Sequence, residues 1–123
     1  MDAIVLIGRI LYGGILVILG FNNYIKLKKK TELAKSKGVP FPRQSVIFST
    51  ALITLGGLSI LLNYQIGIGV LFVWIFLIPT TIMVHNFWTL EDPIAKEIDM
   101  LHFLKNIALL GAALIFLGLP HSN

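Results

Sequence analysis

The chain has 123 residues and a formal net charge of +4, with 56% hydrophobic residues, 13% charged residues and a mean hydropathy of +0.86. Soluble domains carry about 25% charged residues, and a soluble chain this short cannot bury so much apolar surface. This composition argues against a soluble enzyme, a nucleic-acid-binding protein and a disordered tail. The absence of cysteine also excludes disulfides, thiolate metal sites and cysteine nucleophiles in this chain.

Four long apolar runs follow one another along the chain. They cover about residues 3–25, 45–63, 67–86 and 102–119. Each is close to the roughly 20 residues that a helix needs to cross the hydrocarbon core, and the third run lacks the polar outer face that a soluble bundle requires. We therefore expect one all-α transmembrane domain over residues 1–123, a four-transmembrane-helix bundle with up-down-up-down topology.

Basic residues are concentrated between the first two runs, where six lysines and Arg43 accompany a single acid, Glu32. With four spans, this segment and the one between the third and fourth runs share one side, which holds nine of the ten Lys and Arg residues. The positive-inside rule then predicts a multi-pass cell-membrane protein with loops 1 and 3 in the cytoplasm and both termini outside. The basic run is a topology signal that also attracts anionic headgroups. Nucleic acid is not expected as a partner, because no aromatic residues are interleaved with the charges.

Small and polar residues recur at helical spacing in three of the runs. The stripes are Arg9, Gly13, Gly20 and Asn23 in the first run, Thr50, Thr54 and Gly57 in the second, and Ala108, Gly111 and Ala112 in the fourth. In lipid, small residues let helix backbones approach one another closely. We expect these stripes to face the interior of the bundle.

Polar side chains gather at the predicted cytoplasmic ends of three helices, where they form a candidate ligand site. They are Asn23 at the end of the first run, His85, Asn86 and Trp88 around the end of the third, and His102, Lys105 and Asn106 at the start of the fourth. Polar groups at this depth are costly in lipid, so their convergence predicts a polar mouth to an apolar cavity. Helix-end capping explains His85 and Asn86 equally well, and Trp88 also suits the interfacial aromatic belt.

Two further groups bear on chemistry. Arg9 lies on the glycine stripe, which favours a buried charge paired with Asn63, Gln65 or an anion, although snorkelling to the outer headgroups is the alternative. The acids between the third and fourth runs, among them Asp99, are expected in a solvated loop rather than in a bundle core. No metal site is therefore predicted.

Several short motifs resemble those of the DoxX-like family of integral membrane proteins. They are Gly8-Arg9 with Asn23, Gly38-Val39-Pro40, Gly56-Gly57, His85-Asn86-Phe87-Trp88, and the stretch from Phe103 to Gly111. The last two are the most specific, and the resemblance covers nearly the whole chain. Relatives in this family include the large subunit of thiosulfate:quinone oxidoreductase.

The resemblance implies a quinone-binding or quinone-reactive subunit of a membrane redox complex in the respiratory chain. In that case quinone is the cofactor, His85, Lys105 and Asn106 donate hydrogen bonds to its oxygens, and His85 relays a proton as the catalytic residue. The alternative is a non-catalytic accessory, assembly or scaffold subunit, so whether the chain is an enzyme stays open. Expected partners are the lipid bilayer and other subunits of a complex, and homo-oligomerisation also stays open.

Overall fold

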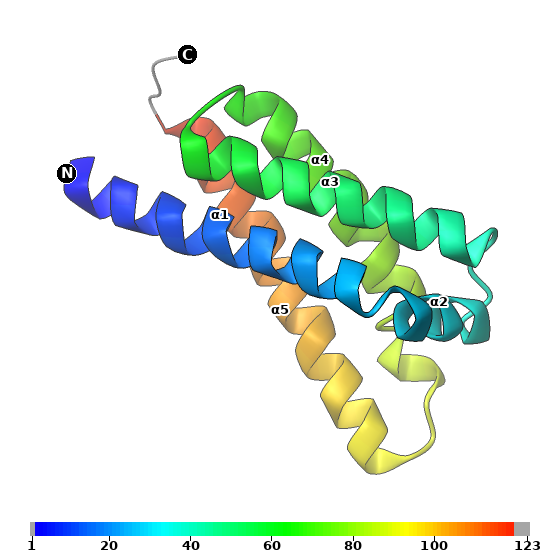
Figure 1. Ribbon diagram of the computed structural model, residues 1–123. Helices are drawn as coiled ribbons and strands as arrows, with labels where there is room; N and C mark the ends of the chain where they lie inside the picture. Colours follow the sequence, from blue (N-terminus) through cyan, green and yellow to red (C-terminus); the bar gives the residue numbers. More distant parts are fainter. Residues whose placement is uncertain (1, 120–123) are drawn as a thin grey trace.

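The computed structural model describes residues 2–119 and, of residue 2, only the backbone. Five α-helices and one short 3-10 helix make up the described chain, without a β-strand (Figure 1). They are α1 (Asp2–Ile25), α2 (Leu27–Ser36), α3 (Pro42–Leu62), α4 (Ile66–Met83), η1 (Phe87–Thr89) and α5 (Pro93–Gly118). Four helical segments are long and apolar enough to cross a membrane. The predicted all-α bundle of four membrane-spanning helices is confirmed.

The start of the fourth span differs from the sequence prediction. It was expected near residue 102, but α5 begins at Pro93. The Asp92 side chain caps the helix by accepting a hydrogen bond from the Ala95 amide at 3.1 Å, and proline is well tolerated in the first helical turn. Glu97 and Asp99 therefore lie on the helix, and placing them in a solvated loop was wrong. Hydropathy alone missed this part of the helix because Lys96, Glu97 and Asp99 interrupt its apolar residues.

The basic segment between the first two spans also contains a helix, α2. It lies at the end of the bundle where α1 ends and α3 begins (Figure 1), and it packs mainly on α3. Its buried residue is Ala34, whose carbonyl accepts a hydrogen bond from the Val39 amide at 3.1 Å. Gly38 has a φ of 77°, which lets the chain turn back toward α3.

Glycines bring α3 into backbone contact with a helix on either side. A Cβ atom on Gly57 would lie 2.9 Å from the Gly13 carbonyl oxygen in α1, and one on Gly13 would lie 2.7 Å from the Gly57 oxygen. On the opposite flank, a Cβ atom on Gly56 would lie 2.9 Å from the Gly69 oxygen in α4. A side chain at these positions would push the helices apart, so α3 is the central helix of the bundle.

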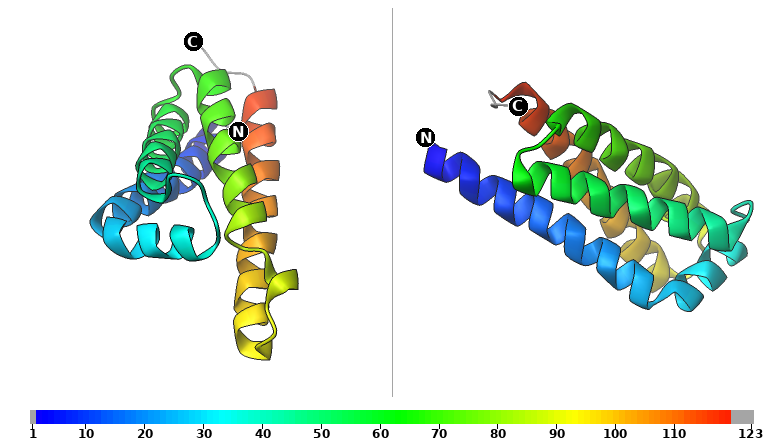
Figure 2. Two further views of the ribbon diagram at one scale, coloured as in Figure 1. Left: turned by 90° about the vertical axis from the view of Figure 1, so that its right-hand side faces the viewer. Right: turned by 45° about the horizontal axis from the view of Figure 1, so that its top comes forward.

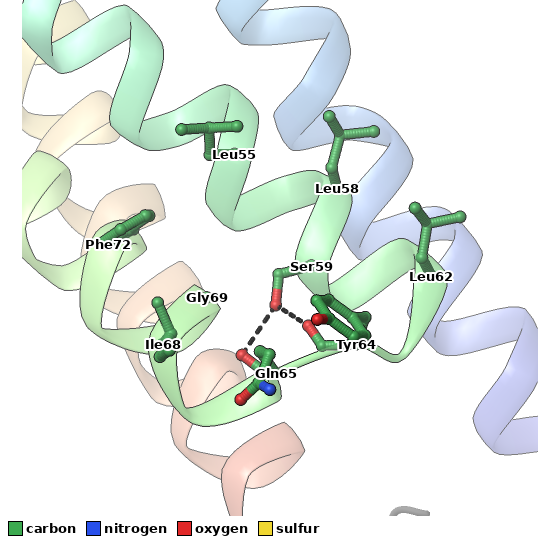
Figure 3. A pocket seen from close by; sticks show the side chains of 9 residues that line it. All are labelled: Leu55, Leu58, Ser59, Leu62, Tyr64, Gln65, Ile68, Gly69 and Phe72. Carbon is green, nitrogen blue, oxygen red and sulfur yellow. Dashed lines mark hydrogen bonds between the residues drawn. The ribbon is translucent and has the colours of Figure 1, made fainter. Parts of the chain in front are cut away.

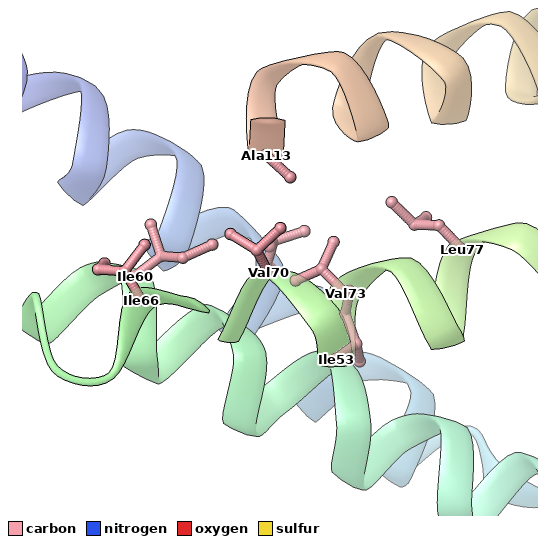
Figure 4. Packing of buried hydrophobic residues seen from close by; sticks show 8 residues of the cluster. Ile53, Ile60, Ile66, Val70, Val73, Leu77 and Ala113 are labelled. Atoms are coloured by element: carbon pink, nitrogen blue, oxygen red, sulfur yellow. The ribbon is translucent and has the colours of Figure 1, made fainter. Parts of the chain in front are cut away.

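An apolar cluster fills the space between these helices and reaches α5 (Figure 4). Its members are Leu16, Ile53, Ile60, Ile66, Val70, Val73, Leu77 and Ala113. The small-residue stripes expected to face inward on the first two runs do so at Gly13, Gly20, Thr50 and Gly57, which are all buried.

The stripe predicted for the last span was wrong. Ala108 and Gly111 are exposed, and a Cβ atom on Gly111 would meet nothing within 4 Å. The buried residues of α5 are Asn106 and Ala113, which share a different face. A Cβ atom on either glycine of α5, Gly111 or Gly118, would meet nothing within 4 Å, so the small residues of this helix do not set its orientation.

Contact between α1 and α5 is concentrated at one aromatic residue. The Tyr12 hydroxyl donates a hydrogen bond to the Leu109 carbonyl oxygen at 2.6 Å, and its ring lies 5.1 Å from the Phe116 ring. From this crossing the two helices diverge toward the α2 end (Figures 1 and 2). The divergence leaves a space inside the bundle that other side chains must line.

The α1–α3 contact predicts a difference between two glycine substitutions. Gly57→Ala is expected to lower the free energy of unfolding by about 1–3 kcal/mol, because the new methyl group overpacks the contact with Gly13. Gly111→Ala, which faces open space, is expected to be neutral or slightly stabilising because alanine favours the helix. Denaturant unfolding in detergent micelles measures both, and equal destabilisation would contradict the proposed packing.

Candidate functional site

A cavity of about 650 Å³ opens where α1 and α5 diverge. Residues from all five described α-helices line it, and its inner wall includes the buried side chains of Leu16, Ile53 and Leu77. Most of the lining is apolar, whereas polar side chains come from the end nearest α2. This volume and this mixture of surfaces are typical of small-molecule sites.

A polar network ties three segments together at that end. Asp99 of α5 contacts His85 Nδ1 at 3.2 Å and Lys37 Nζ at 3.6 Å. Lys37 also donates a hydrogen bond to Asn86 Oδ1 at 2.9 Å. The three charged or titratable side chains are only 16–19% exposed, so water screens their contacts less than on an open surface. Asp99 thus connects the α2–α3 segment to the end of α4.

The two histidines of the site are stacked. The His85 and His102 rings lie 4.9 Å apart with an interplanar angle of 25°. Since Asp99 contacts Nδ1 of His85, Nε2 is the ring nitrogen left for another partner.

Asn106 is the most deeply placed polar group of the cavity lining. Its residue is 4% exposed, and its side-chain amide has no hydrogen-bond partner among residues 2–119. The polar atoms of this amide are not among the solvent-inaccessible groups that lack a partner in the described chain, so they face the open space of the cavity. The amide offers both donors and an acceptor to a bound molecule.

Two lysines line the same mouth from different helices, Lys30 on α2 and Lys105 on α5. Within the described residues, neither forms an ion pair with a carboxylate. Burial lowers the pKa of Lys30 below its ordinary value, and the neighbouring charges of Lys26, Lys29 and Lys105 lower that pKa further. The mouth therefore carries positive charge that residues 2–119 do not neutralise.

The structure separates the residues that sequence analysis had grouped. Those that line the cavity are Asn23, His85, His102, Lys105 and Asn106. Asn86 lies beside it as the partner of Lys37. Trp88 does not line it: the residue is 52% exposed and packs edge-on against Phe87 and Phe103, at 5.4 and 5.8 Å. Trp88 belongs to the 3-10 helix η1 and lies outside the cavity lining.

Sequence analysis missed Lys37, Asp99 and Lys30 as site residues. For Asp99 a signal was present: the Asp92-Pro93 start predicts a helix, and the spacing of Asp99 and His102 then puts them on one face. Lys30 and Lys37 carried no such signal, since the basic segment reads as a run of equivalent charges.

Arg9 lies toward the other end of α1, away from the cavity. It is partly buried, and its Nε is inaccessible to solvent without a hydrogen-bond partner in the described chain. The expected pairing with Asn63 or Gln65 is absent among those residues. Arg9 is therefore a partly buried charge rather than a member of a polar pair.

A smaller hollow of about 330 Å³ lies between α3 and α4 near their turn (Figure 3). The Ser59 hydroxyl donates hydrogen bonds to the carbonyl oxygens of Tyr64 and Gln65, and these bonds stabilise the turn. The left-handed conformations of Asn63 and Gln65 explain why the turn needs such support. The hollow lacks the cluster of charged groups found at the larger cavity.

The Asp99 network predicts the behaviour of a charge-neutral variant. In Asp99→Asn, the amides of Lys37, Gly38 and Val39 are expected to exchange hydrogen about fivefold faster, because loss of a contact of about 1 kcal/mol loosens the segment. Glu97→Gln removes the same charge from an exposed position on α5 and is the control. Hydrogen exchange followed by mass spectrometry tests this, and similar rates in both variants would argue against the network.

Comparison with known proteins identifies the family to which the chain is related. The sequence model of the DoxX family matches residues 4–86, more than half of the chain, from the start of α1 to Asn86. The match ends before α5, which carries Asp99, Lys105 and Asn106. No curated protein and no solved structure matches the chain significantly. With the matched region and the four membrane-spanning helices together, the chain belongs to the DoxX family.

Proposed function

We propose that this protein binds a quinone in the cavity and acts as the quinone-binding subunit of a membrane redox complex. The observation that carries the proposal is the partnerless amide of Asn106 at the polar end of an apolar cavity. A quinone has a polar head and an apolar tail, so it matches both ends of this space. The fit rests on the residues of this chain and on the resemblance to relatives that use quinones.

The cavity is also continuous with the lipid-facing surface. Phe48 of α3 and Ile75 of α4 line it while being 63% and 43% exposed. In a bilayer those exposed parts contact acyl chains. An isoprenoid tail can therefore extend from the cavity into the membrane without crossing a polar layer.

Three residues would hold the head group: Asn106, Lys105 and His85. The Asn106 amide donates to quinone oxygens or accepts from quinol hydroxyls, and the Lys105 ammonium donates only. His85, held at Nδ1 by Asp99, would exchange a proton through Nε2. A bound quinone supplies two-electron, two-proton chemistry, and the protein contributes binding, orientation and proton exchange.

The proposed reaction requires a partner. With no cysteine in the chain, electrons cannot arrive through a thiol pair of its own. We assign the electron donor to another subunit of the complex. The positive-inside rule would place the α2 end, and with it the quinone head, at the cytoplasmic face.

Quinone retention by the purified protein tests this function. Asn106→Leu is expected to weaken binding of a short-chain quinone about tenfold, since a lost hydrogen bond is worth about 1.4 kcal/mol here. Ala108→Leu places the same side chain on the lipid-facing side of α5 and should bind normally. Titration in detergent micelles measures both affinities. If the unaltered protein retains no quinone, the non-catalytic accessory role is the better assignment.

A further inference from the structure

We propose that Lys30 and Lys105 form a specific binding site for the phosphate of an anionic phospholipid at the mouth of the cavity. This inference concerns a second ligand, whose site would share Lys105 with the proposed quinone site, and it stands or fails on Lys30 independently of the quinone proposal. It rests on the convergence of two lysines from separate helices, on the lack of a neutralising carboxylate, and on the contact of the mouth with lipid.

The charges around Lys30 are all of one sign. Lys26, Lys29 and Lys105 are the charged groups that act on it, and no carboxylate acts among the described residues. Asp99 is the acid that lines the cavity, and it is already in contact with Lys37 and His85. Lys30 is half-buried and Lys105 is exposed at the mouth. Holding the charge of Lys30 partly out of water beside other lysines is unfavourable unless an anion joins them.

The geometry favours a phosphate carried by a lipid over a free ion. Leu33 of α2 and Ile98 of α5 line the same cavity and are 39% and 51% exposed. They give acyl chains an apolar surface beside the two ammonium groups. Lysines on two helices surround a phosphate as separate point charges, which suits the tetrahedral oxygens of a phosphodiester.

The test uses the full chain in detergent micelles and counts bound lipids by native mass spectrometry. Phosphatidylglycerol is the anionic probe and phosphatidylcholine the zwitterionic one. Lys30→Gln and Lys105→Gln are each expected to weaken phosphatidylglycerol binding about fivefold, because one lysine near an anionic headgroup contributes about 1 kcal/mol. Lys28→Gln and Lys35→Gln remove the same charge from exposed positions of α2 and should change binding less than twofold. Lys30→Arg keeps the charge and should retain binding even if Lys30→Gln loosens α2.

Three results would overturn the site. Equal losses in the Lys28 and Lys35 variants would indicate diffuse attraction to the basic segment. Equal binding of phosphatidylcholine would show that the net negative charge is not recognised. Stabilisation by inorganic phosphate alone, with the same dependence on Lys30, would assign the site to a free anion. Lys30 is not among the proposed quinone contacts, so Lys30→Gln should retain quinone. Loss of quinone binding in the unaltered protein would contradict the proposed function only.

Discussion

Backbone contact through glycine pairs holds α1 and α4 on opposite flanks of α3, and the remaining structure is arranged around this unit. In lipid, apolar side chains gain little by leaving the acyl chains for one another, so helix association depends on close packing and polar contacts. Gly13 with Gly57, and Gly56 with Gly69, provide that packing. The apolar cluster, with residues from α1, α3, α4 and α5, packs around these two interfaces.

The last helix is held differently, and this difference creates the cavity. It packs along α4 and meets α1 mainly at Tyr12, whose hydroxyl reaches the Leu109 carbonyl. Beyond this point no small-residue contact draws α5 toward α1. The helices diverge, and a space of about 650 Å³ remains where α2 and the ends of the spans supply polar side chains. The site is thus a consequence of asymmetric packing in a small bundle.

Charge at the mouth divides into two kinds. Asp99 compensates Lys37 and contacts His85, so this part of the mouth joins helices and orients an imidazole ring. Lys30 and Lys105 have no carboxylate partner among the described residues, which supports the proposed phosphate site. Asn106 is neutral and buried deeper, where a charged residue would be far more costly.

The sequence by itself determined the number of spans, the all-α class, the inward glycine stripe of α1 and the position of most polar cavity residues, because hydropathy and helical periodicity are local properties. Hydropathy overlooked the start of α5 at Pro93 and the helix α2, and no local pattern showed that Ala108 and Gly111 face outward. Local patterns also could not pair Asp99 with Lys37, which are far apart in the chain, or turn Trp88 away from the site. The outward face of α5, the Asp99–Lys37 contact and the position of Trp88 depend on packing between helices, which no single helix specifies.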